Sequence, residues 1–212
     1  RITSQIGSTE MRARVRTTAV GLLAAALLAA CSSGAPETEA AGTGPDFVQM
    51  LRLTSSYSYV PYVDPKAMLD GVDVVFVGTV QDLSTAVVAD ELDGQGALLV
   101  GLKKKEVWKG SPDTKDGLVY VSLPRPKNVE LSTYEAALPA GTEFVVFGII
   151  HPPSTRFSSG GPGVTAYVPE AQGLYVAESP SKLTNVWADD ITSSEWAGID
   201  SIEDLRKAAL QR

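Results

Sequence analysis

The sequence predicts a mainly β fold, either a small closed barrel or a sandwich, with a short helix before the first strand and another helix at the C-terminus. Stretches rich in β-branched and aromatic residues recur between positions 72 and 187, and turn signals such as Asp93-Gly94 separate them. Strands at this spacing are typical of antiparallel β architectures and not of a parallel sheet. Two short segments with helix-capping residues, one on each side of the strands, predict the two helices.

The region from Met11 to Cys31 predicts an export signal. Three arginines lead into an apolar run, Ala19–Ala30, which is too short to cross a bilayer as a helix and has the length of the apolar part of a signal peptide. The run ends in the letters LAAC, and here the sequence resembles a bacterial lipoprotein signal. The resemblance implies cleavage between Ala30 and Cys31, diacylation of Cys31, and attachment to the extracytoplasmic face of the cell membrane.

This signal divides the chain into five expected parts. The residues before Met11 have no apolar periodicity and are expected to be an upstream extension, and the stretch after Cys31 is small and polar, as in a flexible tether. A tether of this length has an average reach of roughly 20 Å, which keeps the domain close to the bilayer. The expected boundaries are 1–10 for the extension, 11–30 for the signal peptide, 31–46 for the tether, 47–190 for the β domain and 191–212 for a C-terminal segment with the last helix.

Charge and cysteine content exclude several classes of function. The formal net charge is -7, and four of the 18 basic residues lie within the first 30 positions, so the exported part is more acidic than the whole chain. Nucleic-acid binding needs clustered positive charge, so no nucleic-acid partner is expected. Cys31 is the only cysteine and His151 the only histidine. With Cys31 acylated, disulfides, thiolate nucleophiles and cysteine-ligated metals are excluded, and neither a metal site nor another cofactor is expected.

A tyrosine cluster, formed by Tyr57, Tyr59 and Tyr62, is the first candidate ligand site along the chain. Tyrosine rings at close spacing stack on sugar rings, so a glycan-binding platform is one interpretation. The other interpretation is that the rings cover one edge of the core and leave their hydroxyls at the surface, which is an ordinary use of tyrosine. The sequence alone leaves both interpretations open.

The helix before the first strand is expected to begin at Asp64, an N-cap residue followed by proline, and to end at Gly71. In the strand expected at Ala97–Lys109, the three consecutive lysines Lys103–Lys105 place charge on both faces, which predicts an edge strand protected against further pairing. The expected strands are Val72–Val80, Ala97–Lys109, Leu118–Leu123 and Glu143–Ile150, followed by a hairpin of Gly173–Glu178 and Leu183–Trp187.

The order of the segments VDVVFVGTV, KEVWKG, LVYVSLP and LPAGTEFVVFG resembles the five-stranded OB-type barrels of the netrin and tissue-inhibitor-of-metalloproteinase-like group. It is also similar to exported actinobacterial proteins built on that pattern. The resemblance covers roughly Pro65–Trp187 and implies a small OB-like antiparallel barrel. The eukaryotic members use cysteines near their N-terminus to inhibit metalloproteases, and this chain has none there. Protease inhibition is therefore not implied.

The chain closes with a predicted helix that Ser201 caps, with Asp204 at the position where an acid completes a capping box. Its apolar face, which includes Leu205 and Ala209, is expected to pack on the barrel. This helix is expected to be structural.

We therefore expect a non-catalytic binding or adaptor module at the cell envelope. The membrane is its expected partner through Cys31, and an envelope protein or a cell-wall polymer is its expected ligand. No catalytic residue is predicted, because the sequence has no G-x-S-x-G motif that presents a serine nucleophile. Two alternatives stay open: an envelope hydrolase that uses His151, which lies in a proline-stiffened loop after a strand, and a glycan-binding module that uses the tyrosine cluster.

Overall fold

The computed structural model describes residues 45–54, 59–89, 96–126, 128–150, 157–188 and 194–211. By its internal contacts the chain divides into two units, Arg1–Glu37 and Thr38–Arg212, and every described residue lies in the second. The predicted signal peptide and lipidation site therefore lie outside the described residues. Within the described part, no helix combines the length and the apolar character needed to cross a membrane.

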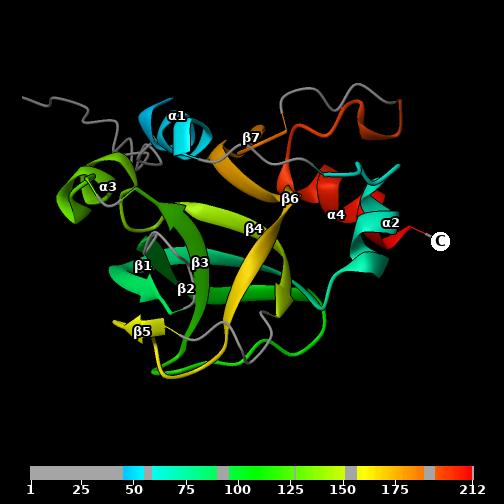
Figure 1. The fold of residues 1–212 in the computed structure, drawn as a ribbon. Coiled ribbons are helices and arrows are strands. Elements are labelled where there is room, and N and C mark those ends of the chain that lie inside the picture. Colours follow the sequence, from blue (N-terminus) through cyan, green and yellow to red (C-terminus); the bar gives the residue numbers. More distant parts are fainter. Residues whose placement is uncertain are drawn as a thin grey trace, which may run out of the picture. The chain divides into compact units, whose positions relative to one another are not determined.

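Helices and strands follow one another in the order shown in Figure 1. The helical elements are α1 (Pro45–Thr54), α2 (Pro65–Gly71), α3 (Leu131–Ala137), the 3-10 helix η1 (Ser194–Trp196) and α4 (Ile202–Leu210). The strands are β1 (Val74–Val88), β2 (Gly96–Lys109), β3 (Leu118–Arg125), β4 (Glu143–Ile150), β5 (Phe157–Ser159), β6 (Ala166–Ser179) and β7 (Lys182–Asn185).

Five of the strands pair in a closed circuit. β1 pairs with β2, β2 with β3, β3 with β6, β6 with β4, and β4 returns to β1. Four of these pairings are antiparallel, and β3 and β6 are parallel over two residue pairs. The strands β5 and β7 lie outside the circuit and pair with β1 and β6, respectively. The prediction of a mainly β fold with a short helix before the first strand and a C-terminal helix is confirmed.

One apolar cluster, which we call the ring interior, takes alternate residues from all five strands of the circuit. Phe76 of β1 meets Tyr167 of β6 edge to face, with 6.3 Å between ring centroids. The helix α1 adds Phe47, whose ring lies 5.9 Å from that of Phe144 on β4. The helix α3 adds Tyr134, which is fully buried. Alternation along the strands thus places one face of each strand in a common core.

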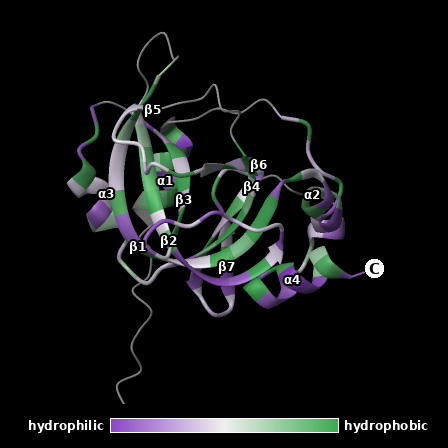
Figure 2. Cartoon of the chain, turned by 90° about the horizontal axis from the view of Figure 1, so that it is seen from below, coloured by the Kyte–Doolittle hydropathy of each residue, from purple (hydrophilic) through white to green (hydrophobic). Residues whose placement is uncertain are grey.

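A second apolar cluster, which we call the outer layer, forms on the opposite faces of β1, β4 and β6. Strand residues such as Val75 and Phe147 pack there against α2, η1 and α4, through Met68, Trp196 and Leu205. Figure 2 shows that hydrophobic residues dominate the strands of the circuit, whereas α2 and α4 carry hydrophilic residues as well. Amphipathic helices therefore cover the outer faces of these three strands.

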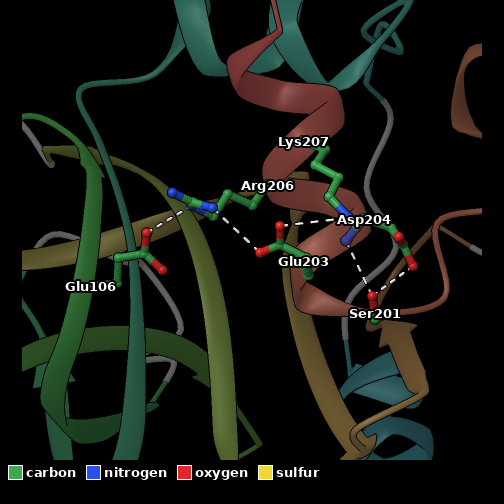
Figure 3. A network of polar contacts seen from close by, with 6 residues as sticks. All are labelled: Glu106, Ser201, Glu203, Asp204, Arg206 and Lys207. Carbon is green, nitrogen blue, oxygen red and sulfur yellow. Dashed lines mark hydrogen bonds and ion pairs between the residues drawn. The ribbon is translucent and has the colours of Figure 1, made fainter.

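Both predicted helix caps are present. The Asp64 side chain accepts a hydrogen bond from the Ala67 N–H at 2.6 Å and begins α2. At α4, the Ser201 hydroxyl accepts from the Asp204 N–H at 3.1 Å and donates to the Asp204 carboxylate at 2.6 Å (Figure 3). The acid at this position thus binds the capping hydroxyl.

Two strands are longer than their sequences predicted. β1 continues beyond Val80 to Val88, past a register shift between Val80 and Asp82 where polar residues follow the apolar run. β6 begins at Ala166, well before Gly173. It contains Pro169 and bends where its pairing with β4 is irregular. Proline and glycine signal turns in a sequence, but here they mark a bend inside one strand.

The prediction of an edge strand at the lysine run is wrong at its first residue. Lys103 pairs with Thr79 on one side and with Leu118 on the other, so β2 is internal at this point. Beyond Lys103 the pairings of β2 within the described residues are with β1 alone, so the remaining lysines do lie at an edge. Lys105 there forms an ion pair with Glu143 of β4.

Candidate functional site

The segment from Tyr59 to Val63 crosses the outer layer before α2 and contains the described part of the predicted tyrosine cluster. Tyr57 lies outside the described residues, whereas Tyr59 and Tyr62 are both half-buried. The ring of Tyr62 packs over Gly71 at the end of α2, so closely that a Cβ at Gly71 would lie 2.8 Å from the ring. The structure therefore gives the Tyr62 ring a packing contact within the fold, and the glycan-binding role of the cluster stays a prediction.

Two side chains from distant parts of the chain hold the backbone of Tyr62. Its N–H donates to Oε1 of Gln172 on β6 at 2.6 Å, and its carbonyl oxygen accepts from the indole N–H of Trp196 in η1 at 3.2 Å. Gln172 is 1% exposed and is one of two buried polar residues in the described part of the chain. A backbone donor and acceptor of one residue are thus both satisfied by side chains, as in the binding of an extended peptide.

A line of hydrogen bonds continues from Gln172 to α1. The Asn185 side chain donates to the Gln172 carbonyl oxygen at 2.7 Å and accepts from two backbone N–H groups of the residues that follow β7. Arg52 at the end of α1 donates to the carbonyl oxygens of Asn185 and Val186, at 2.9 and 2.6 Å. We call Arg52, Asn185, Gln172 and Tyr62 the polar seam. It connects α1, β7, β6 and the segment before α2.

Burial dominates the electrostatics of this region. It raises the pKa of Tyr62, and the nearby carboxylate of Glu170 raises it further. Burial also raises the pKa of Tyr175 on β6, and the Asn185 side chain only partly offsets that rise. The side-chain amide nitrogen of Gln172 is buried and has no hydrogen-bond partner among the described residues. The two tyrosines and the Gln172 amide are uncharged near neutral pH, so these three groups can bind through shape and hydrogen bonding.

The outward side of the segment is apolar. Val60 is 89% exposed and Val63 is 67% exposed, and Pro61 between them is also exposed. At the other end of the polar seam, Leu53 in the last turn of α1 is 84% exposed. The segment thus presents aliphatic side chains to solvent from a backbone that is held in place.

The remaining predicted site residues, Ala30, Cys31, Tyr57 and His151, lie outside the described residues. Among the residues that the structure does describe, no group of three or more histidine, cysteine or acidic side chains is placed to hold a metal ion.

Comparison with known proteins gives no relative from which a role for this site can be transferred. No family model, no curated protein and no solved structure matches the chain. The site must therefore be interpreted from its own geometry.

Sequence analysis missed Gln172 and Trp196. They lie 110 and 134 positions from Tyr62, and no local pattern connects them to it. Gln172 did carry one signal in the sequence. Its amide lies between Ala171 and the apolar run Gly173–Ala177, in the middle of a strand. Buried amides inside strands require a partner, and this one binds the backbone of Tyr62.

Proposed function

We propose that the protein is a lipid-anchored, extracytoplasmic lipoprotein that acts as a non-catalytic binding or adaptor module at the cell envelope. The observation that carries the proposal is the sequence LAAC at the end of an arginine-led apolar run, with Cys31 as the only cysteine of the chain. Diacylation of Cys31 would anchor the protein, because two acyl chains together hold a protein stably on a membrane.

The β fold supports a binding role. Its circuit of five strands has one parallel pairing, between β3 and β6, and carries α3 between its third and fourth strands. This arrangement supports kinship with OB-like barrels, which are small binding scaffolds with interaction surfaces on their strands and loops. Fold kinship alone does not determine an activity, so the proposal is limited to binding.

The test of anchoring is mass spectrometry of the N-terminal peptide after expression of the full chain in a bacterium that processes lipoproteins. We expect a new N-terminus at Cys31 that carries a diacylglyceryl group, and recovery of the protein in the membrane fraction. Cys31→Ser should remove the lipid and release the protein, or leave it with an uncleaved signal. An unmodified Cys31 in a membrane-free protein would refute the proposal.

The test of the adaptor role is crosslinking in intact cells, with Cys31→Ser as the unanchored control. We expect one envelope protein, or cell-wall polymer, to be recovered with the anchored form and lost with the control. Hydrolysis of an envelope substrate that disappears in His151→Ala would instead identify an enzyme and would overturn the non-catalytic assignment.

A further inference from the structure

The exposed apolar side chains of the domain are concentrated at the start of its described sequence. Seven large hydrophobic residues of the described part are exposed, and the three most exposed are Leu53, Val60 and Val63. These three lie within 11 consecutive positions, whereas the other four are each 50% exposed or less. Scattered single exposures are normal for a protein surface, but such a concentration indicates an interaction surface.

The segment that carries Val60 and Val63 is fixed in an orientation that keeps them outside. Its half-buried tyrosines, Tyr59 and Tyr62, are three positions apart, and the residues between and after them are exposed. A repeat of three is the period of an extended polyproline II chain, which Pro61 favours. Because Gln172 and Trp196 bind the backbone of Tyr62, burying Val60 and Val63 against a partner would require little additional ordering of the segment.

Leu53 is connected to this segment through the polar seam. Arg52, its neighbour, binds the backbone of Asn185, Asn185 binds that of Gln172, and Gln172 binds Tyr62, each through a hydrogen bond of 2.9 Å or less. In Figure 1, α1 and the segment that leads into α2 both lie in the upper half of the domain, away from β5. We call Leu53, Val60, Pro61 and Val63 the apolar edge.

The position of the apolar edge along the chain identifies its partner. Pro45, where the described structure begins, is 14 residues from Cys31, so even a fully extended chain places the two at most about 50 Å apart. A polar chain of that length has an average reach of roughly 20 Å, while a domain of this size is about 40 Å across. A bilayer that holds Cys31 therefore meets the side of the domain that carries α1 most often.

We propose that the apolar edge rests on the lipid bilayer that holds the acylated Cys31, with Val60 and Val63 inserted at the boundary between headgroups and acyl chains. The proposal rests on the proposed function, because the lipid supplies the proximity. Full burial of an aliphatic side chain contributes about 1.5–3 kcal/mol, so a few partly inserted residues bind weakly alone. Attachment through Cys31 makes this contact intramolecular and raises its effective concentration.

The chemistry of the surroundings favours apolar insertion over attraction to phosphate groups. Asp64 and Glu170 flank the segment and oppose an anionic surface. Two basic residues lie next to the apolar edge in sequence and already have partners: Lys66 forms an ion pair with Asp70, and Arg52 binds backbone carbonyl oxygens. Lys103 and Lys104 are exposed, but they lie on β2 and not on the apolar edge. Insertion should therefore be insensitive to ionic strength, whereas contact through the lysines would weaken as salt screens it.

The test uses the full-length lipoprotein in phosphatidylcholine vesicles that contain spin-labelled lipids. Acylation blocks the only native thiol, so Val60→Cys and Val63→Cys can each carry one environment-sensitive fluorophore. The matched control is Ser159→Cys, an exposed position on β5. We expect a blue shift of the emission and quenching by the spin labels at positions 60 and 63, at low and high salt alike, and neither effect at position 159.

Mass spectrometry of Cys31 in the same samples separates this proposal from the function on which it rests. If Cys31 is acylated and positions 60 and 63 behave like position 159, the apolar edge does not contact the bilayer and the proposal is overturned, while the anchoring stands. If Cys31 is not acylated, both proposals fail. Quenching that requires anionic lipid and disappears at high salt would also overturn it, because an electrostatic contact would then replace insertion.

A second measurement tests whether the fluorophores at positions 60 and 63 themselves cause the contact with lipid. With the fluorophore at Leu53→Cys, the double substitution Val60→Asp/Val63→Asp should reduce quenching by the spin-labelled lipids, because two carboxylates oppose insertion of the edge. Ser159→Asp should leave that quenching unchanged. Equal quenching in both variants would show that position 53 contacts lipid independently of the segment, which contradicts a common surface.

Discussion

The ring interior and the outer layer are both apolar cores, but they are specified in different ways. The ring interior takes alternate residues from five strands, and Phe76, Phe144 and Leu174 are representative members. The outer layer packs helices on three of the same strands and contains Tyr62 of the polar seam. The bonds of the seam from Tyr62 to Gln172 and from Arg52 to Val186 join residues more than 100 positions apart. Local alternation is enough to build the first core, whereas the second depends on particular long-range hydrogen bonds.

The largest expected effect is in the ring interior. Phe76→Ala removes a fully buried ring that meets Tyr167 edge to face. Loss of a buried phenylalanine and the cavity it leaves typically destabilise a protein by about 3–5 kcal/mol. We expect a loss of that size in the free energy of unfolding, measured by urea denaturation.

The matched control is Leu210→Ala at the exposed end of α4, which should change the free energy of unfolding by about 0.5 kcal/mol or less. Equal losses in the two variants would show that the ring interior is not the dominant core.

The two cores also differ in how far the sequence predicts them. The strands around Val75, Leu98, Val119 and Val145 could be located from their β-branched runs, and the fold class followed from their number and spacing. The helix α3 was missed, because its only fully buried residue is Tyr134 and no side chain caps its start. Seven residues with one buried position carry too little periodicity to identify a helix.

The candidate site was only partly predictable for a related reason. The close spacing of Tyr59 and Tyr62 indicated this segment as a candidate site, because aromatic spacing is visible in a sequence. What the segment does depends on Gln172 and Trp196, whose contacts with it require the completed fold. Exposure of Val60 could not be predicted either, since a valine beside tyrosines equally fits a core position.

The next prediction tests whether one amide organises the outer layer. Gln172→Leu keeps the side-chain size but removes the acceptor for the Tyr62 N–H. A buried donor left without a partner costs about 1–3 kcal/mol. We expect a loss in that range, together with faster hydrogen exchange at Tyr62.

Gln81→Leu, at an exposed glutamine of β1, is the control and should change the free energy of unfolding by about 0.5 kcal/mol or less. Unchanged hydrogen exchange at Tyr62 in Gln172→Leu would mean that Trp196 and ring packing hold the segment without the amide.

A third prediction uses the titration of Tyr175 in the outer layer. Burial raises its pKa in the folded protein above the ordinary value, which the unfolded chain retains. Above about pH 10 the unfolded chain therefore loses this proton while the folded protein keeps it, and stability falls with rising pH by up to about 1.4 kcal/mol per pH unit. Below that pH the group is neutral in both states and contributes no pH dependence.

Tyr175→Phe should flatten this alkaline decline, measured as the free energy of unfolding between neutral pH and pH values above the tyrosine range. Part of the slope should remain, because burial also raises the pKa values of Tyr62, Tyr134 and Tyr167. An unaltered slope in Tyr175→Phe would assign the decline to these other tyrosines.

The smallest effects are expected where α4 meets the surface of β2, because solvent replaces the lost contacts. Ser201→Ala removes the capping hydroxyl of α4 and should cost about 1 kcal/mol (Figure 3).

Glu106→Gln removes the charge that pairs with Arg206. The two groups lie 2.8 Å apart and both side chains are more than 40% exposed, so the substitution should cost about 0.5 kcal/mol or less. Because salt screens the ion pair but not the cap, high salt should abolish the effect of Glu106→Gln and leave that of Ser201→Ala, measured by thermal denaturation. A larger loss from Glu106→Gln than from Ser201→Ala would mean that α4 is held by the charge pair across to β2 more than by its own cap, and the outer layer would then depend on ion pairs as well as on the polar seam.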